Sequence, residues 1–166
     1  MGFKALFIGG IKSGKSKNAE LYTLDLVKGQ PIYLATTEFF DEEMQERVKK
    51  HKDQRADKFE TVEESLLIDN AITKQNKTVL LECVSMWINN MLYHQKTLDE
   101  MLLQLENISK QNNDVICVIN DVSNSVISEN PLVRKFVDYN GIIAQYIAEH
   151  SEEVYHVTAG IKVKIK

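Results

Sequence analysis

The sequence has few of the residues that break or cross-link a polypeptide. Among 166 residues there are two prolines, seven glycines and two cysteines. Because so few prolines and glycines argue against a flexible linker, residues 1–166 are expected to form one domain. Cys83 and Cys117 each lie inside an apolar run and lack the spacing of metal ligands, which predicts free, buried thiols.

The sequence also lacks recognisable targeting and membrane segments. It has no stretch of about eighteen apolar residues that could span a bilayer, and no charged N-terminal region followed by an apolar stretch and a cleavage site. The formal net charge is −4 and the pI is about 5.6, so the basic surface needed for broad nucleic-acid binding is missing. We therefore expect a cytoplasmic protein with no membrane span and no nucleic-acid partner.

The chain does contain an alternation of short apolar runs and longer segments with helical character. Four runs have the length of buried strands: residues 5–9, 32–36, 78–84 and 115–120. Four segments are predicted helices: residues 15–27, 41–53, 97–110 and 131–149. Uniformly apolar runs are typical of parallel strands covered on both faces. The pattern predicts an α/β fold with a mainly parallel sheet, right-handed crossovers and a C-terminal antiparallel hairpin within residues 154–166.

Two of the predicted helices have contrasting surfaces. In residues 15–27 the apolar side chains are expected mostly on one side; they are Ala19, Leu21, Tyr22, Leu24 and Leu26. Residues 41–53 are highly charged, which predicts a helix that faces solvent.

Residues 9–16, directly after the first apolar run, form a glycine-rich loop. The run Gly9-Gly10-Ile11-Lys12-Ser13-Gly14-Lys15-Ser16 matches G-x-x-x-x-G-K-[ST]. In such a loop backbone N–H groups point at phosphate oxygens, the lysine reaches the outer phosphates and the hydroxyl holds Mg²⁺. A glycine turn that only joins strand to helix is the alternative, which pattern and context together disfavour. We predict a P-loop nucleotide-binding domain in which Lys15 is catalytic and Ser16 is a Mg²⁺ ligand.

A magnesium ion in this loop also requires an acidic partner at the end of a buried strand. Glu82 follows three apolar residues of the third run, and Asp121 directly follows the fourth run. A lone carboxylate at the end of such a run is costly to bury unless it binds a partner, such as a metal ion or a metal-bound water. Asp121 could instead cap the element that follows it. We favour Glu82 as the nucleotide- and metal-binding acid, with Asp121 as the alternative.

Further stretches narrow the class of P-loop protein. In order, they are residues 32–37 (IYLATT), 41–55 (DEEMQERVKKHKDQR), 61–65 (TVEES), 80–92 (LLECVSMWINNML), 129–141 (ENPLVRKFVDYNG) and 157–166 (VTAGIKVKIK). With GGIKSGKS before them, nearly the whole chain resembles adenosylcobinamide kinase/adenosylcobinamide-phosphate guanylyltransferase, the bifunctional enzyme that assembles the nucleotide loop of cobalamin. The resemblance implies a RecA-like sheet, a homotrimer and a corrinoid small-molecule substrate.

The resemblance also implies two reactions. In the first, the γ-phosphoryl group of ATP or GTP passes to the hydroxyl on the aminopropanol arm of adenosylcobinamide. In the second, a histidine attacks the α-phosphorus of GTP and pyrophosphate leaves. The GMP on the histidine then passes to the phosphate of the substrate, which gives adenosylcobinamide-GDP.

The family's nucleophilic histidine lies in a segment R-[IV]-x-x-H-x-x-x-R, which matches residues 47–55 and implies that His51 is the nucleophile. An imidazole is nucleophilic only when neutral, and cations such as Lys50 and Lys52 lower its pKa while they attract phosphate. The alternative is that His51 is a solvated histidine on a charged helix without a catalytic role. The residues alone favour this alternative, and the family match disfavours it. Three other histidines match no motif: His94, His150 and His156.

Four more residues complete the predicted site. Ala35, Thr36 and Thr37 match nucleotide contacts of the family. Glu63 matches the acid of the family's T-x-E segment, where a carboxylate could pair with N1–H and N2–H₂ of guanine. For Glu63, a plain first-turn helix acid after Thr61 is an equally weighted alternative.

The match is weaker in other places. After Asp121 the family has a Gly-x-Gly stretch and a proline, whereas residues 122–128 read VSNSVIS, which removes positions that can approach a ligand closely or take positive φ. The family's R-P-x-x-W is RADKF at residues 55–59, and Val137 and Ala144 replace an arginine and an asparagine. Corrinoid handling is therefore expected to differ more than nucleotide chemistry. The competing hypotheses are a kinase or guanylyltransferase with another acceptor, and a nucleotide-binding protein of low turnover.

Overall fold

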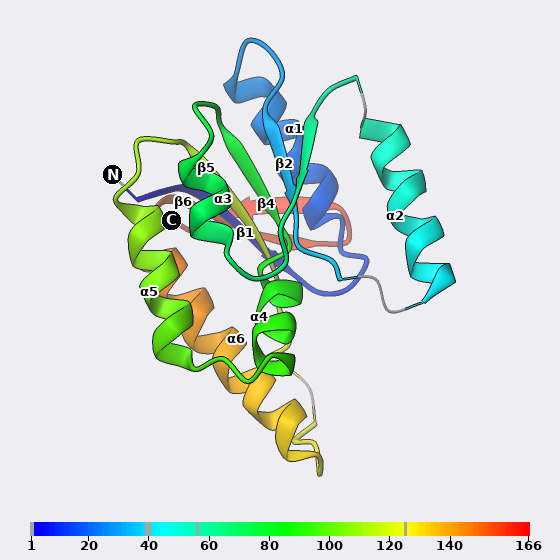
Figure 1. Ribbon diagram of the computed structural model, residues 1–166, viewed down its shortest axis with the longest axis vertical. Coiled ribbons are helices and arrows are strands. Elements are labelled where there is room, and N and C mark those ends of the chain that lie inside the picture. The colour runs from blue at the N-terminus through cyan, green and yellow to red at the C-terminus, as the bar shows by residue number, and fades with distance from the viewer. Residues whose placement is uncertain (1, 39–40, 56, 125) are drawn as a thin grey trace.

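The computed structural model of the protein describes residues 2–38, 41–55, 57–124 and 126–166. Its strands are β1 (Phe3–Gly9), β2 (Ile32–Ala35), β3 (Glu60–Glu63), β4 (Val79–Glu82), β5 (Val115–Asn120), β6 (Ser151–Thr158) and β7 (Ile161–Lys164). Its helices are α1 (Lys15–Leu26), α2 (Glu42–Arg55), α3 (Ile68–Thr73), α4 (Val84–Tyr93), α5 (Leu98–Ser109) and α6 (Pro131–Glu149). Figure 1 shows the sheet at the centre with helices on both sides.

The strands form one sheet in the order β3-β2-β4-β5-β1-β6-β7. β1 lies between β5 and β6 and is parallel to both, and β2, β3, β4 and β5 are also paired in parallel. Within the described chain, β7 alone is antiparallel, against β6. The α/β fold and its C-terminal hairpin confirm the prediction. Because parallel strands share a direction, the residues that follow β1 to β5 meet along one edge of the sheet.

Both faces of the sheet are buried. On one face Leu81 belongs to an apolar core with α3, α4, α5 and α6 that includes the fully buried Trp87. On the other face Phe7 and Leu80 pack with Ala19 of α1. Because neighbouring residues of one strand face different cores, uniformly apolar runs result. Of the helices that the structure describes, none combines the length and apolar character of a membrane span.

α1 packs through smaller residues than its spacing predicts. Leu21 and Leu26 are exposed, whereas Ala19 and Thr23 are fully buried. The Thr23 hydroxyl donates to the carbonyl of Ala19 at 2.8 Å, so its burial leaves no polar group unpaired. The expected one-sided apolar set is therefore wrong at Leu21 and Leu26, because small side chains form the contact with the sheet.

Three elements lie outside the predicted set: β3, α3 and α4. The four residues of β3 are exposed or half-buried, so they form no apolar run. α4 begins one residue after β4, so apolar residues continue across the boundary, and the Ser, Thr, Asp or Asn that commonly marks a helix start is missing. The Cys83 thiol instead caps α4 by accepting from the Met86 N–H at 3.2 Å.

A charged cluster around Glu153 holds the hairpin side of the sheet. The Glu153 carboxylate accepts hydrogen bonds from Lys164 at 2.8 Å, Tyr22 at 2.8 Å and Tyr155 at 2.9 Å. The Lys164 bond, followed by the two tyrosine bonds, lowers the pKa of Glu153 to about 2 from an ordinary value of 4.5. Since the folded-state pKa is the lower one, the carboxylate stabilises the fold above pH 4.5, and this contribution is lost as the pH falls toward 2.

Replacing Glu153→Gln should therefore lower the free energy of unfolding by about 1 kcal/mol near neutral pH, after allowance for the solvent exposure of the cluster. The difference from the wild type should narrow as the pH is lowered through the acid range, which denaturant unfolding at several pH values would measure. Glu152→Gln is the matched control, because Glu152 is an exposed acid that pairs with Lys4. Equal losses for the two variants, or a difference that does not change with pH, would contradict this account.

Candidate active site

The phosphate loop connects β1 to α1 at the carboxyl edge of the sheet, and close contacts require two of its glycines. A Cβ at Gly9 would lie 2.5 Å from the carbonyl oxygen of Val157, and a Cβ at Gly14 would lie 3.0 Å from the Cα of Gly160. Gly14 also has a φ of 90°, in the left-handed region. The glycines of the motif therefore serve close packing as well as loop curvature.

The turn of the C-terminal hairpin supports this loop from the side. The Gly160 N–H donates to the carbonyl of Ser13 at 2.7 Å. The side-chain amide of Asn18 donates to the carbonyls of Gly14 at 2.9 Å and Gly160 at 3.2 Å, which joins α1 to the hairpin. No local sequence pattern indicates this supporting role of the hairpin.

Two polar side chains of the loop are turned inward. Lys15 is buried, and its ammonium donates to the carbonyl of Gly10 at 3.1 Å. The Ser13 hydroxyl is buried and has no hydrogen-bond partner among the described residues. Ile11 and Lys12 are exposed at the tip of the loop. An ammonium has three N–H donors, and a hydroxyl can both donate and accept. The donors of Lys15 and Ser13 that have no protein partner can therefore bond to phosphate oxygens.

Ser16 and Glu82 meet at the start of α1. The Ser16 hydroxyl donates to Oε1 of Glu82, while Oε2 is buried without a partner in the part of the chain that the structure describes. Burial raises the pKa of the Glu82 carboxyl to about 7, although the Ser16 hydrogen bond opposes this rise. Because Mg²⁺ prefers oxygen ligands of these kinds, a hydroxyl beside a carboxylate with one unpaired oxygen fits a magnesium ion.

Asp121, the alternative acid, is engaged differently. Its carboxylate accepts from the Ser123 N–H at 3.0 Å and from the Ser123 hydroxyl, and it lies 3.8 Å from Nε2 of His156. The Ser123 bonds are the largest causes that lower the pKa of Asp121. Its backbone N–H donates to the carbonyl of Gly9 at 2.8 Å. Asp121 therefore starts the turn after β5, next to the phosphate loop, while Ser16 contacts Glu82.

The residues after β2 lie beside Glu82. Ala35 is paired in register with Glu82. Thr36 is fully buried, and its hydroxyl donates to the carbonyl of Cys83 at 2.8 Å and accepts from the Cys83 N–H at 3.0 Å. The Thr36 side chain thus joins the ends of β2 and β4, and its backbone N–H donates to the carbonyl of Glu82 at 3.3 Å. Thr37 follows as a half-buried residue.

α2 carries His51 and is attached to the sheet near its C-terminal end (Figure 1). Arg55 is buried, and its guanidinium lies 3.6 Å from the centroid of the Tyr33 ring, a cation–π contact. Lys52 pairs with Glu63 of β3, with 3.6 Å between Nζ and Oε1. Glu63 lies at the end of a strand, so the helix-acid alternative for this residue is wrong. The charged sequence around Arg55 gives no sign of this anchoring role.

His51 is exposed on α2, and its pKa is lowered. Partial desolvation is the largest cause, followed by the charges of Arg55, Lys12 and Lys50. Lys12 belongs to the phosphate loop, so its influence places the imidazole within electrostatic reach of that loop. A lowered pKa favours the neutral, nucleophilic form of the imidazole.

The departures from the family pattern fall in distinct places. Of residues 122–128, position 125 lies outside the described residues, and the others connect β5 to α6. Val137 and Ala144 are half-buried on α6. Phe59, where the family has tryptophan, is buried with its ring edge-on to Tyr33 at 5.8 Å between centroids, so this replacement keeps an aromatic side chain in the core.

The phosphate loop, the Ser16–Glu82 pair, the end of β2 and the helix with His51 thus share one edge of a parallel sheet. This fold and this site define a P-loop nucleotide-binding protein. Two solved structures share the fold: the flagellar accessory protein FlaH from Methanocaldococcus jannaschii (TM-score 0.54, 11% identity, 99% of this chain and 78% of that chain) and a type III secretion system ATPase of pathogenic bacteria (TM-score 0.53, 12% identity, 99% and 57%). The profile of the cobinamide kinase / cobinamide phosphate guanyltransferase family matches residues 5–165, and the chain belongs to this family.

Curated relatives are similar over their full length. The bifunctional adenosylcobalamin biosynthesis protein CobU of Escherichia coli is 34% identical over 180 residues, and its counterpart from Salmonella typhimurium is 32% identical, each with 97% of this chain and 98% of the relative covered. CobP of Pseudomonas aeruginosa, which has the same description, is 30% identical over 97% of this chain and 96% of the relative.

Proposed function

We propose that the protein phosphorylates adenosylcobinamide with ATP or GTP and then transfers GMP from GTP to the product, which gives adenosylcobinamide-GDP. The observation that carries this proposal is the attachment of α2, in which Lys52, the residue after His51, pairs with Glu63 at the end of β3. A nucleotide seated in the loop can then present its γ-phosphate to an acceptor and its α-phosphate to His51. The description of the matching family names a kinase and a guanyltransferase activity, and the relatives are described as bifunctional, which supports the proposal.

In the kinase reaction, the loop binds the outer phosphates and Lys15 neutralises charge that develops on them. Ser16 and Glu82 would hold Mg²⁺, which supplies further neutralisation when bound. The acceptor hydroxyl attacks the γ-phosphorus, and the bond from that phosphorus to the β,γ-bridging oxygen breaks, so that the nucleoside diphosphate leaves. The hydroxyl proton passes to solvent as the ester forms.

In the guanylyl transfer, the neutral imidazole of His51 attacks the α-phosphorus of GTP. A phosphorus–nitrogen bond forms, the bond to the α,β-bridging oxygen breaks, and pyrophosphate leaves. A phosphate oxygen of the first product then displaces the imidazole. We expect Lys52 to contact the phosphates and Glu63 the guanine base, and the ion pair between them across α2 and β3 supports a common site.

The direct test is incubation with GTP labelled at the α-phosphate, with and without adenosylcobinamide phosphate. We expect label to stay on the protein until the acceptor is added and then to move to the corrinoid. Label that stays on the protein after addition would favour a guanylyltransferase with another acceptor, which is our second candidate because Ser123 bonds to Asp121 where the family has glycine. Complete absence of label would contradict the guanylyltransferase proposal.

We also propose that the protein acts in the cytoplasm as a homotrimer. Ile161, Val163 and Ile165 are exposed along β7 and the residue that follows it, which offers an apolar edge for association. Light scattering would measure the mass, and a monomer at working concentration would contradict the trimer.

A further inference from the structure

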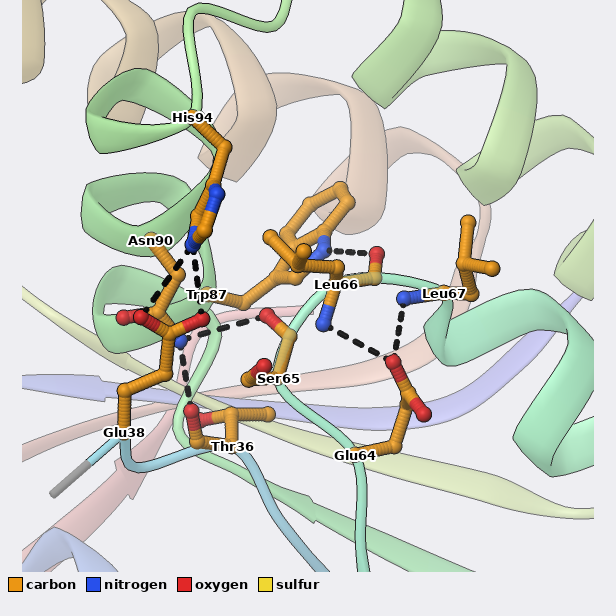
Figure 2. Close-up of polar contacts among 9 residues, drawn as sticks. All are labelled: Thr36, Glu38, Glu64, Ser65, Leu66, Leu67, Trp87, Asn90 and His94. Carbon is orange, nitrogen blue, oxygen red and sulfur yellow. Dashed lines mark hydrogen bonds and ion pairs between the residues drawn. The ribbon is translucent and has the colours of Figure 1, made fainter.

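One side of α4 holds the loops that follow β2 and β3. Figure 2 shows Trp87 and Asn90 of α4 and His94, which directly follows the helix, turned toward these loops. The Trp87 indole N–H donates to the carbonyl of Leu66 at 2.9 Å, and Nε2 of His94 lies 3.1 Å from the Glu38 carboxylate. α4 therefore contacts both connections at the edge of the sheet that carries the site.

Asn90, the middle residue, joins the two loops through one amide group (Figure 2). Its side chain is fully buried, and Nδ2 donates to the carbonyls of Thr36 at 2.6 Å and Ser65 at 3.2 Å. Thr36 follows β2 and Ser65 follows β3, beyond the paired registers of those strands. Asn90 is thus the residue of α4 that donates hydrogen bonds to both carbonyls.

These loops carry two residues of the predicted nucleotide site. Thr37, a predicted nucleotide contact, directly follows Thr36, and Glu63, the candidate for guanine recognition, lies two residues before Ser65. The phosphate loop has a separate support from Gly160, in the turn between β6 and β7, and from Asn18 of α1. On the proposed function, the two ends of a bound nucleotide are therefore held by different parts of the fold.

We infer that Asn90 is a positioning residue that sets the affinity for the nucleoside part of GTP, and with it the delivery of the α-phosphate to His51. It would act through the loop backbone, without touching the nucleotide. Loss of its N–H groups leaves the carbonyl of the buried Thr36 and that of the half-buried Ser65 without this partner, and loops with unpaired carbonyls relax toward water. The inference rests on the proposed function, because that proposal places the nucleoside at these loops.

Asn140 on α6 provides a matched control. It is also a buried asparagine, and its Nδ2 donates to the carbonyl of Asn120 at 2.9 Å while its Oδ1 accepts from the Ser85 hydroxyl at 2.6 Å. Asn140 therefore holds the end of β5. Asn140→Ala removes a similar buried amide and should lower the free energy of unfolding by a similar amount. It leaves the loops after β2 and β3 in place.

The test compares two affinities by titration calorimetry in the presence of Mg²⁺: that for the α,β-methylene analogue of GTP, which cannot transfer GMP to His51, and that for inorganic triphosphate, which probes the phosphate loop alone. Asn90→Ala should weaken binding of the GTP analogue by about tenfold or more, because two hydrogen bonds are lost, and should leave triphosphate binding within about twofold. Asn90→Leu, which has a similar shape, removes the donor without a large cavity or a buried charge and should have the same effect if the alanine variant folds poorly. Asn140→Ala should leave the ratio of the two affinities unchanged.

An unchanged ratio in both Asn90 variants would overturn the inference. An equal change of the ratio in Asn140→Ala would also overturn it, because the effect would then be general loosening of the fold. Failure of the proposed function appears separately, as absence of label from α-labelled GTP on the wild type, while the calorimetric ratio still decides the role of Asn90.

Discussion

Replacing Lys15 with alanine is expected to reduce phosphoryl transfer by about a thousandfold or more. The Lys15 ammonium is buried in the phosphate loop and has the carbonyl of Gly10 as a partner. No other described cation of the loop is buried beside the path of the phosphates, since Lys12 is exposed. The charge that develops on the transferred group would therefore lose its neutralising partner.

The fold should survive this change, because Lys15 belongs to neither apolar core. The measurement is the kinase rate beside a thermal melt. Lys17→Ala is the control, since Lys17 is an exposed lysine on the same helix, and it should keep nearly full activity. An unchanged rate in Lys15→Ala with an intact melt would remove the loop lysine from the mechanism.

Replacing His51 with alanine is expected to abolish labelling of the protein by α-labelled GTP while much of the kinase activity remains. On the proposed function the label is a phosphoramidate on the His51 imidazole, so the variant lacks the group that accepts GMP. Transfer of the γ-phosphoryl group is proposed to depend on the loop and a bound metal, which requires no covalent histidine. In the wild type the label should survive denaturation, be stable in alkali and be lost in acid, because protonation of the nitrogen makes it a good leaving group.

His150→Ala is the control for this experiment. His150 is an exposed histidine at the end of α6, with Nδ1 2.8 Å from the carbonyl of Tyr146. It should label as the wild type does. Label that persists in His51→Ala would move the nucleophile to another residue. Loss of both activities would mean that His51 also positions nucleotide for the kinase reaction.

The rate of labelling should also depend on pH in a predictable direction. Only the neutral imidazole attacks, and desolvation together with Arg55, Lys12 and Lys50 lowers the pKa of His51 below its ordinary value of 6.5. The midpoint of the acid decline in the labelling rate should therefore lie below pH 6.5. Lys50→Gln removes one of these cations, so its rate should begin to fall at a higher pH than that of the wild type. Identical pH profiles for the two proteins would contradict this electrostatic account.

The sequence by itself determined the features that depend on local pattern. The apolar runs predicted β1, β2, β4 and β5 because strands buried on both faces admit few polar residues. The phosphate loop is a contiguous motif in which spacing alone encodes backbone shape. The location of His51 on a charged helix followed from one short segment and its family resemblance. Each of these features depends only on residues that are close together in the sequence.

The tertiary structure decided how distant residues meet. Ser16 contacts Glu82, 66 residues away, only because β1 and β4 are placed in one sheet with β5 between them. The support of the phosphate loop by Gly160 also depends on the pairing of β6 with β1.

The local sequence pattern likewise does not indicate that α2 is attached to the sheet or that Asn90 joins two loops. Arg55 contacts Tyr33, and Asn90 contacts Thr36 and Ser65. These residues are far apart in the sequence, and the order of the strands brings them together. Periodicity in a sequence reports which side of an element is buried, but it does not report which partner lies there. Partners are selected by the order and direction of the strands, and for this reason the site was predicted residue by residue while its supporting contacts were not.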